Sequence, residues 1–287
     1  MESVLQVLKG LIAVAFLVSA TVLCCLAIYL LAVVRMLTPV RQARSALTGS
    51  MDGIVTCWVS GNAWLIRLLR LIEFKTTIEG VLDNRSNWWI LTSNHQSWSD
   101  VIIIQVVLLN LAPPIKFFTK RELIWVPFVG LAMWLLRFPY VQRRVRASNG
   151  RNSSAYEKNR RNMSRAAEQF LHRPISVLSF LEGTRFTAEK HQSQSSPFLH
   201  LLTPRTGGLL FTIDALGSKT STIVDLTLNY EGAVPGFWEL LCGRCKAVNI
   251  FIQPVEMTNQ TQSNPKEFVN DLWKRKDDRL TELRSTS

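Results

Sequence analysis

The sequence has 287 residues, a formal net charge of +12, 47% hydrophobic residues and a mean hydropathy of +0.13. This length is sufficient for a large domain with a substantial core, and the hydrophobic content is typical of contact with a bilayer. The positive charge favours an anionic partner: a membrane surface, a phosphorylated substrate or nucleic acid. Five cysteines, an odd number, argue against a framework of disulfide bonds.

The N-terminal segment predicts a membrane anchor over residues 1–36. Lys9 and Arg35 enclose 25 residues without a charge. As a helix this run would be about 37 Å long, enough to cross a hydrocarbon core of roughly 30 Å. A cleavable signal peptide is the disfavoured alternative, because the apolar run continues past the weak cleavage site. Lys9 alone precedes the run, whereas Arg35, Arg41 and Arg44 follow it. This excess of positive charge predicts that the rest of the chain is on the cytoplasmic side.

Residues 37–72 predict a second helical segment. Its second half, residues 54–72, is apolar but carries Arg67 and Arg70 near one end. This pattern suits a helix lying in the membrane interface, and a helix packed against the protein core fits it equally well.

From residue 71 onward the chain alternates between strand-like and helical patterns. The pattern predicts strands over residues 71–80, 88–93, 115–120, 138–142, 174–181, 222–232 and 247–257. It predicts helices over residues 97–110, 121–136 and 154–172, a polar loop over 187–197, and a final helix from residue 264 with Phe268, Leu272, Leu280 and Leu283 inward. We therefore expect an α/β domain over residues 73–287, with a mainly parallel sheet flanked by helices.

The stretch NHQSWSD, residues 94–100, directly follows a buried strand pattern. Functional residues of α/β sheets collect at the carboxyl ends of strands. If the turn folds back, Asp100 accepts a hydrogen bond from one imidazole nitrogen of His95 and leaves the other as a base. The sequence has no GxSxG elbow to supply a serine nucleophile, so the dyad would act on a hydroxyl of the substrate. A solvated histidine beside a helix cap is the plain alternative.

A second group of polar residues, FLEGTR, follows the strand predicted at residues 174–181. It supplies the carboxylate of Glu182, the flexible turn of Gly183, the hydroxyl of Thr184 and the guanidinium of Arg185. A guanidinium can bind a phosphate through two parallel hydrogen bonds. A salt bridge that fixes the turn is the alternative.

Basic residues dominate residues 143–165, with eight Lys or Arg and one acid. Part of this stretch is expected to lie on anionic lipid. Nucleic acid is a weaker candidate partner, because a membrane anchor is predicted and no nucleic-acid-binding motif is present. Cys242 and Cys245 form a CxxC pair without a second pair, so a reduced pair is favoured over a zinc site.

Together these motifs resemble the PlsC-type glycerolipid (lysophospholipid) acyltransferases over about residues 70–230, the bacterial YihG-like branch being one candidate. NHQSWSD matches the family's N-H-x4-D block, and FLEGTR matches F-P-E-G-T-R with Leu181 in place of proline. Residues 116–130 resemble the K-x-E-L…P-x-x-G block through Lys120, FPYVQRR resembles F-x-x-R through Arg143, and LTPRTGGL resembles a later P-x-x-G-G block.

The resemblance implies an O-acyltransferase that moves a fatty acyl group from acyl-CoA or acyl-carrier protein to a lysophospholipid hydroxyl, typically that of lysophosphatidate. It implies His95 as base and Asp100 as its partner. Substrate binding falls to Glu182, Gly183, Thr184, Arg185, Arg143 and Lys120. Neither a metal nor another cofactor is expected. The implied partners are the anionic membrane, the lysophospholipid and the acyl donor, with the catalytic domain on the cytoplasmic face of a bacterial inner membrane.

Three alternatives remain at this stage. The chain could acylate a lysophospholipid with another head group, or use the same dyad to hydrolyse a thioester or lipid. It could also be a membrane-anchored binding protein with a degenerate fold. The presence of His95, Asp100, Glu182 and Arg185 together argues against degeneration.

Overall fold

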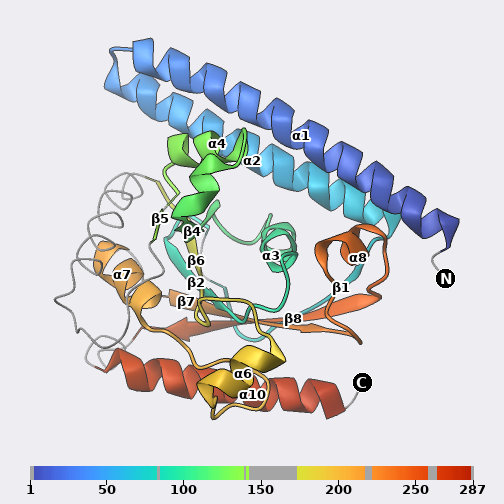
Figure 1. Ribbon diagram of the computed structural model, residues 1–287. Coiled ribbons are helices and arrows are strands. Elements are labelled where there is room, and N and C mark those ends of the chain that lie inside the picture. The colour runs from blue at the N-terminus through green and yellow to red at the C-terminus, as the bar shows by residue number, and fades with distance from the viewer. Residues whose placement is uncertain are drawn as a thin grey trace.

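A six-stranded sheet forms the centre of the protein (Figure 1). The computed structural model describes residues 3–82, 85–138, 140–141, 173–216, 222–257 and 264–285. The sheet order is β1-β8-β7-β2-β6-β3. The strands are β1 (Glu73–Ile78), β2 (Trp89–Ser93), β3 (Ile115–Phe117), β6 (Ser176–Phe180), β7 (Thr222–Tyr230) and β8 (Ala247–Glu256).

The predicted α/β fold with a mainly parallel sheet is confirmed. Strand β2 pairs in parallel with both β6 and β7, and β3 pairs in parallel with β6. Strand β8 is antiparallel to β7, and β1 is parallel to β8. The sheet is therefore mixed: β7, β2, β6 and β3 run one way, and β8 and β1, at one side of the sheet, run the other.

Helices cover both faces of this sheet (Figure 1). On one side lie α1 (Val4–Leu37), α2 (Arg41–Leu69), α3 (Asp100–Val107), α4 (Val129–Leu135) and α8 (Phe237–Leu241). On the other lie α6 (Ala188–Gln194), α7 (Gly207–Leu216) and α10 (Pro265–Ser285). A 3-10 helix, η1 (Arg121–Trp125), precedes α4, and β4 (Thr119–Lys120) pairs with β5 (Tyr140–Val141).

The central strands are buried on both faces, as expected for parallel strands between two layers of helices. Along β2, Trp89 and Leu91 belong to the core under α2 and α3, whereas Ile90 belongs to the core under α7 and α10. This alternation follows from the two-residue period of a strand. The β2 strand is thus held at the middle of the sheet, and its carboxyl end has a defined position.

Several predicted boundaries were wrong. The helix expected from residue 97 begins at Asp100, because residues 97–99 form a turn stabilised by the Asp100 carboxylate. The strand expected over residues 115–120 is divided between β3 and β4, which belong to different sheets. The helix expected over residues 121–136 is divided into η1 and α4.

Short helices account for most of the remaining differences. The loop expected over residues 187–197 contains α6, which Thr187 caps by accepting from the Lys190 backbone N–H. Helices α7 and α8 were not predicted. Of the residues 138–142, where a strand was expected, 138 and 140–141 are described, and only Tyr140–Val141 of these form a strand, β5. The helix expected over residues 154–172 lies outside the described residues.

The long helices α1 and α2 form a hairpin that lies along the α/β domain (Figure 1). Helix α1 contacts α8 near its N-terminus, where a Cβ added at Gly10 would lie 2.7 Å from Cys242 Sγ. Near its C-terminus the Tyr29 hydroxyl donates to the Phe128 carbonyl, close to α4. Helix α2 adds Val59 and Ile66 to the main core, so its inner face is a core surface.

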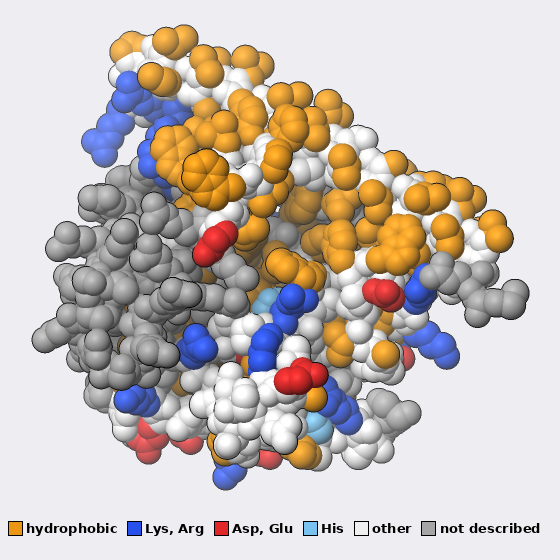
Figure 2. Space-filling model, in the orientation of Figure 1, with side chains coloured by type: hydrophobic (Ala, Val, Ile, Leu, Met, Phe, Trp, Pro, Cys, Tyr) orange, Lys and Arg blue, Asp and Glu red, His pale blue; other side chains and the backbone are white. Residues whose placement is uncertain are grey.

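The outward faces of this hairpin and of the η1–α4 segment are apolar. Figure 2 shows hydrophobic side chains gathered over this face. Most of the exposed residues belong to α1, and Trp125, Phe128 and Trp134 of the η1–α4 segment join them. Within the described residues, α1 is the single helix whose length and composition would allow it to cross a membrane. The presence of this helix is consistent with association of the protein with a membrane.

Candidate active site

The carboxyl end of β2 carries the first residues of the site. Asn94, the residue after this strand, continues the pairing with β7 through its side chain. Its amide nitrogen donates to the Leu228 carbonyl at 2.9 Å, and its amide oxygen accepts from the Leu228 N–H at 2.9 Å. The side chain therefore acts as one more step of the β2–β7 ladder. This pairing fixes the backbone position of His95, which follows at the carboxyl end of β2.

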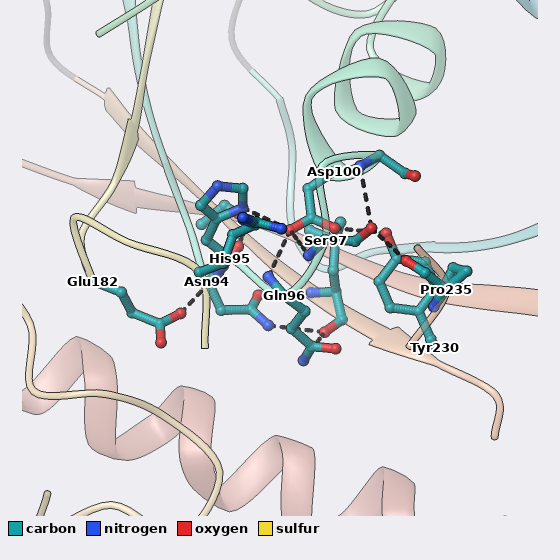
Figure 3. Close-up of polar contacts among 12 residues, drawn as sticks. Asn94, His95, Gln96, Ser97, Asp100, Glu182, Tyr230 and Pro235 are labelled. Carbon is teal, nitrogen blue, oxygen red and sulfur yellow. Dashed lines mark hydrogen bonds and ion pairs between the residues drawn. The ribbon is translucent and has the colours of Figure 1, made fainter. Parts of the chain in front are cut away.

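The imidazole of His95 and the carboxylate of Asp100 lie within hydrogen-bond distance, as the sequence predicted (Figure 3). The distance from His95 Nδ1 to Asp100 Oδ2 is 2.8 Å. The same oxygen accepts the backbone N–H groups of Gln96 at 2.6 Å and Ser97 at 2.9 Å. An oxygen that accepts from two backbone donors is itself unprotonated, so Nδ1 carries the hydrogen and Nε2 presents its lone pair.

Asp100 is fully buried and receives a fourth donor from another strand. Tyr230, at the end of β7, directs its hydroxyl to Asp100 Oδ1 at 2.5 Å (Figure 3). Burial and the charge of Asp100 hold the pKa of the Tyr230 phenol well above its usual value, so the phenol remains a donor. Four donors on one carboxylate compensate its desolvation and fix its orientation.

The ring of His95 is held from its face as well as from its edge. The ring of Phe180 stacks on it with 4.0 Å between centroids and 19° between planes. The side chain of His95 is 16% exposed to solvent. Among the described residues no group hydrogen-bonds to its Nε2. The free nitrogen of an oriented imidazole is the feature that a general base requires.

The nearest serine of the motif does not supply a nucleophile. The Ser97 hydroxyl donates to the Pro235 carbonyl at 2.6 Å and accepts from the Ser99 N–H at 3.2 Å. Its oxygen is thus engaged in shaping the turn, which fits attack by a hydroxyl of the substrate.

Glu182 joins the second motif to the first (Figure 3). Its side chain is fully buried, and its two oxygens accept from the backbone N–H of His95 at 2.7 Å and of Leu202 at 3.0 Å. Burial raises the pKa of Glu182 to about 7, against the opposing effect of these two donors. The geometry therefore favours a role in positioning the His95 loop, while the predicted contact with substrate remains a prediction.

Residues 183–185 form a tight turn beside His95. Gly183 has a φ of +65°, which favours glycine, and a Cβ there would lie 3.1 Å from Cδ of Arg205. The Thr184 hydroxyl accepts from Lys190 Nζ at 3.0 Å. The guanidinium carbon of Arg185 lies 4.4 Å from the centre of the Trp98 ring. The turn thus brings the predicted Arg185 to the mouth of the His95 site.

The other predicted binding residues are not brought to this site by the described part of the chain. Lys120 belongs to β4, and its side chain is not among those that the structure describes. Arg143 lies outside the described residues. The free thiols of Cys242 and Cys245 are both buried, and the described residues contain no group of three or more metal-binding side chains.

Sequence reasoning missed the partners that hold the dyad in place. Asn94 bonds to Leu228 of β7, and Tyr230 reaches Asp100 from the end of β7. Both contacts join residues 130 or more positions apart. Lys190 and Arg205 were also missed as neighbours of the Glu182–Arg185 turn. A signal existed for Tyr230, since a polar aromatic residue ends a strand whose carboxyl end is at the same sheet edge as His95.

This sheet, with a His–Asp pair at the end of its central strand, matches known proteins. A family model described as Acyltransferase matches residues 56–224, more than half of the chain, and the matched part includes His95, Asp100 and residues 182–185. The chain therefore belongs to the acyltransferase family. The crystal structure of the 1-acyl-sn-glycerophosphate (LPA) acyltransferase, PlsC, from Thermotoga maritima shares this fold, with a TM-score of 0.55 and 16% identity over 96% of this chain and 98% of that chain.

Two relatives indicate the range of similar proteins. The 1-acyl-sn-glycerol-3-phosphate acyltransferase gamma of Mus musculus is 25% identical over 175 residues, 56% of this chain and 44% of the relative. Lysocardiolipin acyltransferase 1 of Gallus gallus is 24% identical over 248 residues, 80% of this chain and 62% of the relative. The chain spans about half the length of these curated relatives.

Proposed function

We propose that this protein transfers a fatty acyl group from a thioester donor, acyl-CoA or acyl-carrier protein, to the free hydroxyl of a lysophospholipid. The observation that carries the proposal is the His95–Asp100 pair, whose buried carboxylate accepts four hydrogen bonds while His95 Nε2 stays free. Family membership supports the same reaction class.

In the proposed mechanism, His95 Nε2 takes the proton of the acceptor hydroxyl as its oxygen attacks the thioester carbonyl. The carbon–sulfur bond then breaks, and the thiolate leaves with the proton returned from the imidazolium. Asp100 keeps Nδ1 protonated and stabilises the imidazolium formed during attack. No covalent acyl-enzyme is required, because the substrate supplies the nucleophile.

The proposed acceptor is 1-acylglycerol-3-phosphate, so that the product is phosphatidic acid. Arg185 would bind its phosphate, with Arg143 and Lys120 as further ligands, and Gly183 and Thr184 would form the wall of that site. The names of the mouse relative and of the Thermotoga protein support this acceptor. The YihG-like branch stays a proposal, since these comparisons concern the family as a whole.

A second acceptor class also has support. The chicken lysocardiolipin acyltransferase matches 80% of this chain, a larger share than the mouse relative matches. A lysophospholipid with a larger head group is therefore the alternative substrate, as in the remodelling of existing lipids.

The proposed location is a membrane. Because α1 contacts the α/β domain near both of its ends, we propose that the hairpin lies along the bilayer surface with its apolar face in lipid. The site would face the cytoplasm, as the excess of arginines after the apolar run suggests. The preceding segments, 1–36 and 37–72, would together form the membrane-binding part.

The test is an assay of purified protein with acyl-CoA and a panel of lysophospholipids, followed by mass spectrometry of the lipid products. Acylation of lysophosphatidate with the highest kcat/KM supports the first acceptor, and acylation of lysocardiolipin supports the second. Release of free fatty acid at the same rate with and without acceptor would identify a hydrolase instead. No reaction with any thioester would overturn the proposed class.

A further inference from the structure

Three cations gather at the Glu182–Arg185 turn, and two of them have no task in the proposed mechanism. These two are Lys190, in α6, and Arg205, which precedes α7. Lys190 Nζ contacts the Thr184 hydroxyl at 3.0 Å and the Arg185 carbonyl at 2.8 Å. The side chain of Arg205 lies against Gly183, with Cδ 3.1 Å and Nε 3.4 Å from the position of an added Cβ.

The turn at which these cations meet is hydrogen-bonded to His95 on both sides. Before it, Glu182 accepts from the His95 N–H at 2.7 Å. After it, Phe186 N–H donates to the His95 carbonyl at 2.7 Å. The positive charges of Arg185, Lys190 and Arg205 therefore belong to the immediate surroundings of the proposed base. In Figure 2, Lys and Arg side chains lie beside a histidine in the hollow below the apolar face.

No acid among the described residues forms an ion pair with this group. Among the residues that the structure describes, none of the three cations forms an ion pair. Glu189, the neighbour of Lys190 in sequence, is exposed. Hydrogen bonds to its own backbone and to Thr187 lower its pKa, and the charge of Lys190 lowers it further without forming an ion pair. Like charges placed together repel one another, and a bound anion would relieve that repulsion.

The number of charges indicates more than one phosphate group. A phosphate monoester, such as that of lysophosphatidate, carries about two negative charges near neutral pH. Arg185 is placed for that group by its contact with Trp98, 4.4 Å from the ring centre. Lys190 and Arg205 reach the turn from later segments of the chain and remain in excess. The other substrate of the proposed reaction, acyl-CoA, brings a diphosphate and a further phosphate on its ribose.

We infer that Lys190 and Arg205 form a second anion subsite, which binds the phosphate groups of the coenzyme A moiety of the acyl donor. This inference rests on the proposed function and names a donor subsite for it. The pantetheine arm, which separates these phosphates from the thioester, would then run from the subsite to His95. It would also favour acyl-CoA over acyl-carrier protein, whose prosthetic group has a single phosphodiester.

The experiment compares Lys190→Gln, Arg205→Gln and the double variant with wild type, using two donors and a fixed concentration of lysophospholipid. One donor is acyl-CoA, and the other is the acyl-N-acetylcysteamine thioester, which has the same reacting bond and no phosphate. We expect kcat/KM for acyl-CoA to fall about tenfold in each single variant, since a charge-assisted contact is lost. We expect kcat/KM for the phosphate-free donor to stay within about twofold of wild type.

Other outcomes would overturn the inference. Equal losses with both donors would mean that the two residues support only the shape of the turn. A rise in KM for lysophosphatidate alone would assign them to the acceptor, and no change would mean that they are solvated cations. Lys266→Gln is the matched control, because Lys266 is an exposed cation on α10.

A binding measurement separates failure of this inference from failure of the proposed function. Calorimetric titration of free coenzyme A needs no turnover. Binding that weakens about tenfold in Arg205→Gln would support the subsite even if no acyl transfer were detected. Wild-type protein that does not bind coenzyme A would overturn the subsite while leaving transfer from acyl-carrier protein open to the lipid assay.

Discussion

The carboxylate of Glu182 accepts a hydrogen bond at 2.7 Å from the backbone N–H of His95, a residue 87 positions earlier in the chain. Its second oxygen accepts from the Leu202 N–H at 3.0 Å. One buried side chain thus joins the loops that follow β2 and β6 to the segment before α7. These contacts hold the loops around the base in place, so Glu182 has a structural role that does not depend on any substrate.

Replacing His95 should remove the chemistry and leave the membrane association. His95→Gln has no base at the Nε2 position, and loss of a general base lowers the rate about 10²–10⁴-fold. We expect kcat to fall by this factor in the lipid assay while the protein stays in the membrane fraction after centrifugation. Turnover within about threefold of wild type would exclude His95 as the base.

Replacing Tyr230 should disturb the dyad without removing it. Tyr230→Phe leaves Asp100 with three donors, because the bond of 2.5 Å to Oδ1 is lost. We expect kcat to fall about tenfold, KM for both substrates to stay unchanged, and the midpoint of the acidic limb of the kcat–pH profile to move, since the hydrogen bonding of the orienting carboxylate has changed.

Tyr140→Phe is the matched control for this variant. The Tyr140 hydroxyl donates to the Gly130 carbonyl at 3.2 Å, and the hydrogen bonds described for His95 and Asp100 come from other residues. It should lose some stability and retain the wild-type pH profile. If both tyrosine variants lower activity without a change in pH profile, the role of Tyr230 is limited to packing.

Glu182 should make the stability of the protein depend on pH. Its pKa is about 7 in the folded protein and near 4.5 in the unfolded chain. Between these values the folded state binds more protons, so the free energy of unfolding falls as the pH rises from about 4.5 to 7. The shift corresponds to about 3 kcal/mol, since one pKa unit is about 1.4 kcal/mol.

The measurement is thermal unfolding of wild type and Glu182→Gln at several pH values between 5 and 8. The stability of wild type should fall as the pH rises across this range because Glu182 loses its proton. The stability of the glutamine variant should depend less on pH. Glutamine can accept from one of the two backbone N–H groups, so its stability should also be lower at every pH. Parallel curves for the two proteins would contradict the shifted pKa.

Lys276 should be essential for stability because its charge is buried. This α10 residue donates to Asp225 Oδ2 at 2.8 Å and to the Leu226 carbonyl at 2.6 Å, and Asp225 also accepts from Thr92 at 2.5 Å. Lys276→Met would leave the Asp225 charge buried without its partner, which typically costs about 3–5 kcal/mol. Chemical denaturation measures this loss.

The double variant Lys276→Met with Asp225→Asn is the control for this interpretation. It removes both charges, so much of the lost stability should return. A loss below about 1 kcal/mol in the single variant would mean that Asp225 is solvated or neutral.

Removal of residues 1–36 should release much of the protein from membranes, because the exposed apolar face of α1 is lost. The fraction that remains bound through α2 and basic residues should be washed off by salt, which screens charge. Flotation of the truncated and full-length proteins with vesicles measures the change. If the truncated protein stays bound at high salt, α1 is dispensable for attachment.

The sequence alone determined the elements whose pattern is local. The short apolar run of β2 and the long apolar run of α1 depend on neighbouring residues in the sequence, so the types of these two elements were predictable. The His95–Asp100 pair was predictable for the same reason: the two residues are five positions apart, and the turn between them needs only its own backbone groups.

Tertiary structure decided what surrounds that pair. Tyr230 reaches Asp100 because β7 lies beside β2, and Glu182 reaches His95 because β6 lies on the other side of β2. No local pattern states which strands become neighbours, since that choice depends on burying both faces of the sheet at once. For the same reason the sequence predicts a loop where α6 forms, since this helix has little apolar surface of its own. The cations of Lys190 and Arg205 meet at the turn only in the folded chain.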